Sequence, residues 1–310
     1  MGLSEVSIES LGVSAMAKPL FKKIVIFGVG LIGGSFARAL AQAKAVESGG
    51  IVGLSRAATY EKKKAVLQGI VDRTGIQENL TTELDGADLI LLAVPVGQTA
   101  DILKLIKPFL NENTIITDAG STKSDVVAAA REVLGKRVSQ FVPGHPIAGA
   151  ELSGPESALV DLYQGKKVVL TPLPENIATD VARVRAAWEA CGATVSEMTH
   201  QEHDSVFATV SHLPHLLSFA LLHNLAQREN RDLLLSFAAS GFRDFTRIAA
   251  SSPEMWRDIS MANRVALLKE LQCYIAELNK VSAVLESEDS ERLEQIFCTA
   301  QKMRTDWGAE

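Results

Sequence analysis

The sequence predicts an α/β domain built on a mainly parallel sheet, followed by a second domain made of helices. Short aliphatic segments alternate with helical segments from residue 23 to residue 198, strand-like segments end near residue 200, and long amphipathic patterns continue beyond it. Such alternation is typical of right-handed βαβ units. A length of 310 residues fits two domains. We expect a flexible tail at 1–17, the first domain at 18–198 and the helical domain at 199–310.

Strands are expected where aliphatic and β-branched residues form short runs that suit a buried parallel sheet. These runs cover residues 23–27, 50–54, 70–72, 88–94, 114–118, 140–143, 167–171 and 193–198. Helices are expected between them, at residues 35–43, 59–68, 96–110, 121–134 and 175–191. In the second domain, amphipathic patterns predict helices at residues 213–228, 253–285 and 291–304.

The composition narrows the classes of function. Lys and Arg total 31 and Asp and Glu total 37, so the formal charge is −6. This mild acidity argues against a protein that binds nucleic acid or an anionic membrane surface, because both normally require basic patches. The hydrophobic content of 47% is typical of a globular protein and argues against disorder.

Three further features predict where the protein works. The longest apolar stretch, residues 89–96, is far shorter than the roughly 20 residues that a membrane-spanning helix needs. Residues 1–20 lack the basic and apolar regions of a signal peptide. The three cysteines, Cys191, Cys273 and Cys298, are scattered and form no disulfide or metal framework, which suits a reducing compartment. We therefore expect a cytoplasmic protein.

A glycine motif predicts a dinucleotide-binding site. Gly28, Gly30 and Gly33 form G-x-G-x-x-G directly after the first strand and open the next helix. In a Rossmann-type domain the first glycine permits a tight turn, the second lets the backbone approach the pyrophosphate, and the third allows close packing of helix on strand. A glycine-rich turn without a ligand is the alternative, which the strand context disfavours. Further positions are assigned to the same cofactor site: Leu31, Ile32, Val94 and Pro95.

The end of the second strand predicts the choice of cofactor. An NAD site usually places Asp or Glu there to hold the ribose 2′-hydroxyl. Residues 54–59 contain no carboxylate, whereas Ser55 and Thr59 can donate to a 2′-phosphate and Arg56 can pair with it. We expect NADP as the preferred cofactor and NAD as the weaker alternative. Arg56 as a solvated loop residue is the competing interpretation.

The histidines indicate a reaction centre where the two domains meet, because all six lie between positions 145 and 223. His145 follows the strand at 140–143, and we expect it on a loop at the carboxyl end of that strand, where such sheets bind ligands. A neutral imidazole there can accept a hydroxyl proton. Ser121 can hydrogen-bond a substrate hydroxyl and the His145 ring, or can instead cap the helix that begins near Lys123.

These motifs together resemble the prephenate/arogenate dehydrogenase family of tyrosine biosynthesis. The resemblance rests on residues 28–34, 120–123, 144–151, 211–215 and 241–249, whose order and spacing agree over roughly residues 20–300. It implies a Rossmann-type domain followed by an all-α dimerisation domain, and a homodimer. It also implies an oxidoreductase that decarboxylates a cyclohexadienol while hydride passes to the nicotinamide, with His145 as the base and Ser121 beside it.

The resemblance assigns further residues to the substrate. Arg247 matches the family arginine that holds the ring carboxylate, and His215 matches a contact to the substrate side chain, with His212 lining the same site. Glu151 and Asp204 match positions that form ion pairs around the site entrance. Arg243, which shares a helix face with Arg247 if both lie on one helix, is left as structural. His212 and His215 as a metal pair are disfavoured, because no third ligand accompanies them at a familiar spacing, so we expect no metal.

The family offers two substrates, which differ in a keto or an ammonium group. We expect prephenate, with arogenate also accepted, because His215 can hydrogen-bond a keto-acid side chain and no extra carboxylate demands an amine. An arogenate-specific enzyme is the alternative. Another two-domain hydroxyacid dehydrogenase and a non-catalytic NADP sensor are weaker ones. The resemblance also implies possible feedback inhibition by tyrosine.

Overall fold

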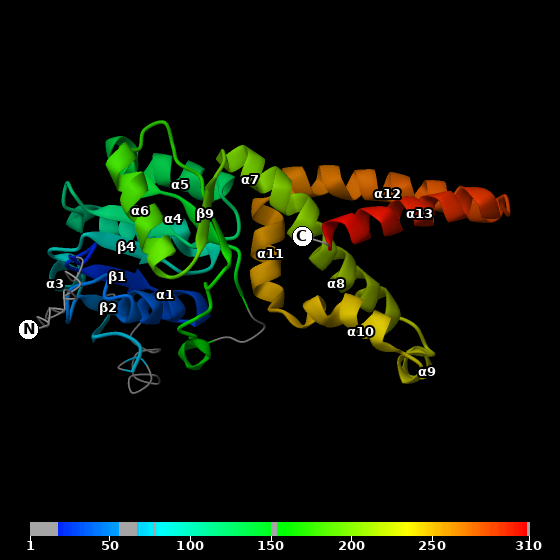
Figure 1. The fold of residues 1–310 in the computed structure, drawn as a ribbon, viewed down its shortest axis with the longest axis horizontal. Helices are drawn as coiled ribbons and strands as arrows, with labels where there is room; N and C mark the ends of the chain where they lie inside the picture. Colours follow the sequence, from blue (N-terminus) through cyan, green and yellow to red (C-terminus); the bar gives the residue numbers. More distant parts are fainter. Residues whose placement is uncertain (1–17, 56–66, 68, 77–78, 150–153, 309–310) are drawn as a thin grey trace, which may run out of the picture.

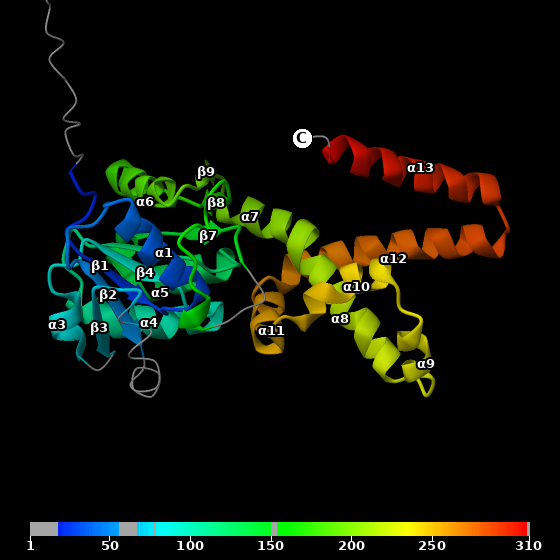
Figure 2. The same ribbon diagram turned by 60° about the horizontal axis from the view of Figure 1, so that its bottom comes forward.

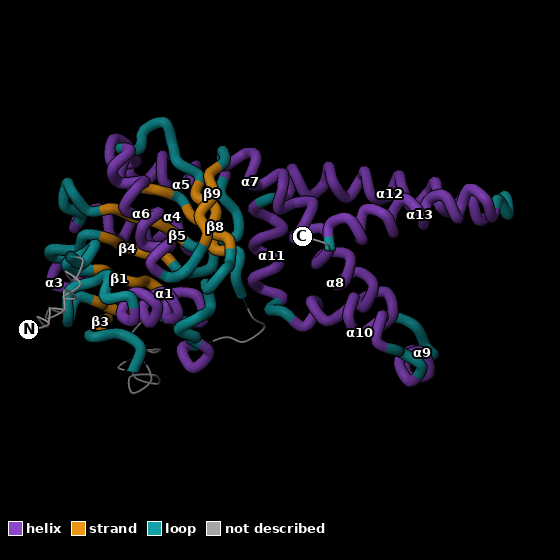
Figure 3. Tube along the Cα trace, viewed as in Figure 1, coloured by secondary structure: helices purple, strands orange, loops and turns teal. Residues whose placement is uncertain are grey.

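A computed structural model of the chain describes residues 18–308, except for 56–66, 68, 77–78 and 150–153. The expected tail at 1–17 and most of the expected helix at 59–68 lie outside the described residues. Figure 1 shows an α/β lobe that contains the N-terminal part of the chain and a helical lobe that extends from it. The strands lie in the first lobe, and the second lobe is built of helices (Figure 3).

The first lobe is built on a six-stranded parallel sheet with the order β3-β2-β1-β4-β5-β6. Its strands are β1 (Ile24–Phe27), β2 (Ile51–Ser55), β3 (Arg73–Ile76), β4 (Leu89–Leu92), β5 (Ile115–Asp118) and β6 (Phe141–Val142). This order is that of the doubly wound dinucleotide-binding fold, so the predicted class of the first domain is confirmed. β3 begins three residues later in the chain than the expected strand at 70–72.

Alternate residues of β1 enter two separate cores. Ile24 and Ile26 pack in the core that also holds α1 (Leu31–Gln42) and α6 (Ala178–Ala190). Val25 and Phe27 pack on the opposite face, with α4 (Thr99–Ile106) and α5 (Ser124–Leu134). A strand that is covered on both faces needs a continuous aliphatic run, which explains why these strands are easy to find in the sequence. The other elements among the described residues of this lobe are α3 (Leu80–Leu84) and the 3-10 turns η2 (Val96–Gln98), η3 (Lys107–Phe109), η4 (Gly135–Gln140) and η5 (Pro155–Ser157).

The strand register aligns the carboxyl ends of the central strands. Phe27 pairs with Leu54 on one side and Leu92 on the other, and Leu92 pairs with Asp118. The segments that leave these strands, including the glycine motif after β1, therefore meet along one edge of the sheet. This is the edge at which such folds bind their ligands.

A second, three-stranded sheet carries His145. It consists of β7 (Gly144–Pro146), β8 (Lys167–Leu170) and β9 (Thr194–Glu197), with β7 antiparallel to β8 and β8 parallel to β9. The expected loop position of His145 is therefore wrong, because His145 pairs with Val169 in this sheet. The strand is only three residues long and contains a proline, so its sequence carries little strand signal.

The helical lobe begins at α7, whose first turn is held by a capping box. The Thr199 hydroxyl accepts from the Glu202 amide at 3.2 Å, and the Glu202 carboxylate accepts from the Thr199 amide at 2.9 Å. The elements of this lobe are, in order, α7 (His200–Phe207), the π-helical segment η6 (Ala208–His212), α8 (Leu213–Ala226), α9 (Arg231–Ser236), α10 (Ser240–Thr246), the 3-10 turn η7 (Arg247–Ala250), α11 (Pro253–Ala262), α12 (Arg264–Glu286) and α13 (Ser290–Trp307).

The helical lobe differs from expectation in three places. The helix expected at 213–228 is confirmed as α8 (Leu213–Ala226), but α7 and η6 precede it without having been expected. The helix expected at 253–285 divides at Asn263. Two short helices, α9 and α10, have no counterpart in the expected set. α12 and α13 form a hairpin whose tip points away from the α/β lobe (Figure 2).

One helical run in the described chain, His200–Ala226, is long and apolar enough to cross a membrane by length and composition. This differs from the expectation drawn from single apolar stretches, because the run spreads its apolar residues over 27 positions with a mean hydropathy of 1.4 in its most apolar window. Length and composition are weak evidence for a span, since core helices pass the same test. Two residues of this run, His203 and Asp204, are buried at the junction with the α/β lobe.

Candidate active site

The glycine motif forms a bare turn at the N-terminus of α1. Gly28 has a φ of +91°, and an added Cβ would lie 2.2 Å from the carbonyl oxygen of Ala93. At Gly33 an added Cβ would lie 2.2 Å from the carbonyl oxygen of Gly28. At Gly30 it would meet no atom of the described chain within 4 Å. The second glycine thus leaves open space where a pyrophosphate would approach the helix N-terminus, and the turn fits a dinucleotide.

A cleft with a volume of about 460 Å³ lies where the carboxyl edge of the sheet meets α11. It brings together many of the predicted site residues, which come from four separate segments: Gly30, Leu31, Ile32, Val94, Pro95, Ser121 and His145. From the helical lobe, Met255, Asp258 and Ile259 on α11 line the same cleft. A dinucleotide at the glycine turn and a substrate at His145 would therefore share one space between the lobes.

The region predicted to select the cofactor is described in part. Ser55 ends β2 and is buried, and within the described chain its hydroxyl makes no hydrogen bond. A buried hydroxyl without a partner is unfavourable unless a ligand satisfies it, so Ser55 fits a position beside the ribose. Arg56, Thr59 and the substrate candidate Glu151 lie outside the described residues.

Asp118 at the end of β5 holds the segments that carry Ser121 and His145 in place, a role that sequence reasoning missed. Its carboxylate accepts from the amide of Gly144 at 3.1 Å and from the amide of Gly120 at 2.9 Å. The same carboxylate forms a buried ion pair with Lys123. Gly144 directly precedes His145, and Gly120 directly precedes Ser121. By binding both amides, the Asp118 carboxylate orients the two segments relative to each other. The signal was a charged residue at the end of an aliphatic strand with an opposite charge five positions later.

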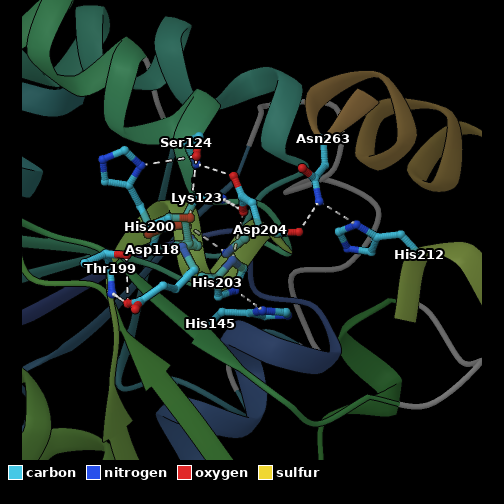
Figure 4. Close-up of polar contacts among 12 residues, drawn as sticks. Asp118, Lys123, Ser124, His145, Thr199, His200, His203, Asp204, His212 and Asn263 are labelled. Atoms are coloured by element: carbon cyan, nitrogen blue, oxygen red, sulfur yellow. Dashed lines mark hydrogen bonds and ion pairs between the residues drawn. The ribbon is translucent and has the colours of Figure 1, made fainter. Parts of the chain in front are cut away.

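His145 is linked to the helical lobe through a second histidine. Its Nδ1 lies 2.8 Å from Nε2 of His203, and Nδ1 of His203 lies 2.8 Å from Oδ1 of Asp204 (Figure 4). The ring of Phe207, one turn after His203, packs against both imidazoles. Burial lowers the pKa of His145 well below its ordinary value, and the nearby His203 and Lys123 lower that pKa further. His145 is therefore neutral near pH 7, the state that a base requires.

Asp204 is placed differently from the expected entrance position. It is 5% exposed, and its carboxylate accepts from the amides of Lys123 at 2.9 Å and Ser124 at 2.8 Å. Asp204 thus caps α5 from another domain, because a helix N-terminus attracts a negative charge. Burial would raise the pKa of this carboxyl, but hydrogen bonds from His203, Ser124 and Lys123 lower it to about 2.

The start of α5 also settles the position of Ser121. α5 begins at Ser124, with Lys123 at the N-cap position, so Ser121 precedes the helix. Its alternative role as the N-cap of this helix is therefore wrong, because Asp204 supplies the cap. Ser121 instead faces the cleft that His145 also lines.

The remaining histidines occupy different environments. His212 is 1% exposed and is not among the described residues that line the cleft. Its Nδ1 accepts from the Asn263 side-chain amide at 3.1 Å, and burial lowers its pKa to about 4. His215 is half-buried, donates from Nδ1 to the carbonyl of Ser211 at 2.8 Å, and stacks on Trp256 with the ring centroids 3.7 Å apart. Asn263 also donates to the Asp204 carbonyl at 2.7 Å, a link that sequence reasoning missed.

Arg247 lies at the beginning of η7, beside α8, which carries His215. Burial lowers the pKa of His215, and the positive charge of Arg247 lowers it further. Arg243 is on α10, whereas Arg247 is in the 3-10 turn that follows. The two arginines therefore do not share the face of one regular helix, because the backbone geometry changes at Thr246.

The fold and the cleft together define a class of protein: a two-domain dehydrogenase, an oxidoreductase that binds a nicotinamide dinucleotide at the carboxyl edge of a Rossmann sheet. Comparison with family models agrees. Residues 36–197 match the nucleotide-binding domain of prephenate dehydrogenase, and residues 199–299 match its dimerization domain. The chain belongs to the prephenate dehydrogenase family.

Individual relatives support this assignment. The chain is 34% identical to a cyclohexadienyl dehydrogenase of Zymomonas mobilis, over 92% of this chain and 96% of the relative. A crystal structure of prephenate dehydrogenase from Aquifex aeolicus, in complex with hydroxyphenyl propionate and NAD+, is 35% identical, with a TM-score of 0.84 over 92% of this chain and 98% of that one. Arogenate dehydrogenase from Synechocystis is 30% identical, with a TM-score of 0.77 over 92% and 99% of the two chains.

Proposed function

We propose that this enzyme catalyses the oxidative decarboxylation of prephenate, and also of arogenate, with NADP as the preferred oxidant. The products would be 4-hydroxyphenylpyruvate and tyrosine, and the place of action the tyrosine pathway in the cytoplasm. The observation that carries the proposal is the shared cleft, in which a neutral histidine base and the bare glycine turn face one space. Family membership supplies the substrate class.

The proposed chemistry assigns one role to each group. The nicotinamide, when bound, supplies the hydride acceptor. Nε2 of His145 accepts the proton of the ring hydroxyl while hydride leaves the carbon that bears it. The ring carboxylate then departs as carbon dioxide, and its bonding electrons complete the aromatic ring as a phenolate. The His145 cation returns its proton to the phenolate oxygen, which gives the phenol and restores the neutral base. Ser121 donates a hydrogen bond to the reacting hydroxyl, and Arg247 holds the ring carboxylate with a planar guanidinium.

Substrate turnover is tested by following reduction of NADP with prephenate, arogenate and a simple 3-hydroxyacid. We expect turnover of both cyclohexadienols, with the higher kcat/KM for prephenate, and none of the hydroxyacid. Activity with arogenate alone would support the arogenate-specific alternative. Turnover of neither cyclohexadienol would overturn the proposed function, and tight NADP binding without turnover would instead support a sensor.

His215 is proposed to accommodate both substrate side chains. Its Nδ1 is committed to the Ser211 carbonyl, so Nε2 is the nitrogen left for a ligand. Burial and Arg247 lower the pKa of His215, so the free ring is neutral and its Nε2 accepts a hydrogen bond, as the ammonium of arogenate requires. Donation to the keto acid of prephenate requires the ring to take up a proton when this anionic side chain binds. The proposed use of both substrates agrees with similarity to both a prephenate and an arogenate dehydrogenase.

The proposed preference for NADP makes a direct prediction. Ser55 presents a buried hydroxyl without a partner in the described chain, and Arg56 and Thr59 follow it in sequence. We expect kcat/KM for NADP to exceed that for NAD by about 10- to 100-fold, since one charge-assisted contact contributes about 1.5–3 kcal/mol. Steady-state kinetics with each cofactor measure this ratio. Arg56→Ala should reduce it towards one, and a wild-type preference for NAD would contradict the proposal.

The proposed carboxylate contact predicts the behaviour of Arg247→Gln. Loss of a charged, bidentate donor should raise KM for prephenate by about 10- to 100-fold, with a smaller effect on kcat. Arg243→Gln is the matched control, because Arg243 is exposed on the neighbouring helix α10. We expect the control to keep the wild-type KM. An unchanged KM in Arg247→Gln would remove this arginine from the ring-carboxylate role.

A homodimer formed through the helical domain, residues 199–310, is also proposed, with residues 18–198 as the cofactor domain. α13, which the structure describes in full, buries none of its side chains in the single chain. Large apolar residues on the lobe are exposed, including Phe237 (81%), Met303 (76%) and Trp307 (71%). A second copy would cover such surface. We further propose that tyrosine, which resembles the product, competes at the substrate site.

A further inference from the structure

A chain of hydrogen bonds links His145 to His203 and Asp204 in the helical lobe. It runs from Nδ1 of His145 to Nε2 of His203 and from Nδ1 of His203 to the Asp204 carboxylate, each step 2.8 Å long (Figure 4). His203 is completely buried and Asp204 nearly so. His145 lines the cleft, so its second ring nitrogen, Nε2, is the one left for a ligand.

The direction of each hydrogen bond follows from the charge of Asp204. With a pKa of about 2, the Asp204 carboxyl is an anion at neutral pH and accepts hydrogen bonds. Nδ1 of His203 must therefore carry a proton, and it donates a hydrogen bond to the Asp204 carboxylate. Burial lowers the pKa of His203, so the ring is neutral and its Nε2 has a free lone pair. Nε2 of His203 accepts from Nδ1–H of His145, which leaves Nε2 of His145 without a proton.

We propose that His203 is a positioning residue that sets the tautomer of His145, and that Asp204 stabilises the positive charge created there during the reaction. For its catalytic consequence this rests on the proposed function. As the substrate O–H bond breaks, a bond forms between that proton and Nε2 of His145, and the ring becomes a cation. Its Nδ1–H then donates more strongly to His203, whose own Nδ1–H is held by the Asp204 anion. In this step the protons on Nδ1 of His145 and on Nδ1 of His203 stay on their own rings.

The three hydrogen-bonded side chains are held in place because the last of them, Asp204, is bonded to both lobes. The Asp204 carboxylate accepts the two amides at the start of α5, at 2.9 Å from Lys123 and 2.8 Å from Ser124. The Asp204 carbonyl accepts from the Asn263 side chain at 2.7 Å. His203 is therefore fixed in place when the helical lobe docks on the sheet. The orientation of the base is thus coupled to the packing of the two domains.

The test compares His203→Leu with His203→Gln. Leucine removes the acceptor for Nδ1–H of His145, whereas the carbonyl oxygen of glutamine can replace it. We expect His203→Leu to lower kcat by about 100-fold or more with KM within about threefold of wild type. We expect His203→Gln to stay within about tenfold of the wild-type kcat. His200→Leu, on the same helix, is the control and should keep the wild-type kcat.

A second measurement follows the tautomer itself. ¹⁵N NMR of the imidazole rings, with the His145 signals identified by their loss in His145→Asn, shows which nitrogen carries the proton. In wild type and His203→Gln we expect Nδ1 of His145 to be protonated. In His203→Leu we expect the proton on Nε2, the position that a free neutral histidine prefers. A merely structural role for His203 would leave this pattern unchanged.

The outcomes separate this inference from the proposed function. A wild-type proton on Nε2 of His145 would overturn the inference without any variant, even if His203→Leu failed to fold. An unchanged kcat and tautomer in His203→Leu would also overturn it. If the wild-type enzyme turned over neither cyclohexadienol, the proposed function would fail, while the NMR pattern would still decide the tautomer.

Discussion

His145→Asn is expected to lower kcat by about 10²- to 10⁴-fold, the usual contribution of a positioned general base. An asparagine side chain is close to imidazole in shape and can still hydrogen-bond to His203, but it cannot take up a proton at neutral pH. KM for prephenate and for NADP should stay within about threefold of wild type, because the binding contacts assigned above lie elsewhere. Steady-state kinetics on the purified variant provide the measurement. Activity near the wild-type level would show that His145 is not the base.

The pH profile provides an independent check on the same residue. Burial, together with the nearby His203 and Lys123, lowers the pKa of His145 below 6.5, so the neutral base persists as the solution becomes more acidic. The acid limb of kcat/KM, which reports the free enzyme, should therefore fall below pH 6.5 in wild type and should be absent in the residual activity of His145→Asn. An acid limb centred above pH 7 would conflict with a partly buried, neutral His145.

Lys123→Met is expected to destabilise the protein by about 3–5 kcal/mol, the usual consequence of removing one partner of a buried ion pair. Lys123 is fully buried, and the substitution would leave the Asp118 carboxylate in the interior without its cation. Asp118 would keep its hydrogen bonds from the amides of Gly120 and Gly144, but these two bonds alone would have to stabilise the buried negative charge. Urea unfolding at a fixed protein concentration measures the free-energy difference.

Two further variants make this prediction specific to the charge. Asp118→Asn combined with Lys123→Met removes both charges and should be more stable than Lys123→Met alone. Lys104→Met removes one partner of the exposed Asp101–Lys104 pair in the same domain, whose side chains are 82% and 62% exposed. This control should change the free energy of unfolding by less than about 0.5 kcal/mol. A loss below 1 kcal/mol in Lys123→Met would contradict the assigned role of the pair.

Much of the α/β lobe was predictable because its strands are covered on both faces. Each such strand must be aliphatic along its whole length, and the runs at 23–27, 88–94 and 114–118 therefore locate β1, β4 and β5 within a few residues. The glycine motif was equally readable, since Gly28 and Gly33 occupy positions where a Cβ would collide with backbone. Local sequence and local geometry agree at these positions.

Short elements that depend on their neighbours were not predictable. β7 has three residues and pairs with β8, more than 20 positions away, so its stability lies in the partner strand. α9 and α10 have six and seven residues, too short for an amphipathic pattern to stand out, and none of their residues is buried in the single chain. The long amphipathic pattern at 253–285 continues across Asn263, where the structure divides it into two helices. The side chain of Asn263 hydrogen-bonds to Asp204 and His212, which the pattern could not indicate.

By itself, the sequence determined the class of fold, the dinucleotide turn and the identity of His145 as the candidate base. Only the tertiary structure decided how that base is held. Asp204 and Ser124 are 80 positions apart, and His145 and His203 are 58 apart, yet each pair is in hydrogen-bond contact. A carboxylate can be buried only where several donors converge on it. Here those donors come from α5 and from His203, so the role of Asp204 exists only once the two lobes are packed together.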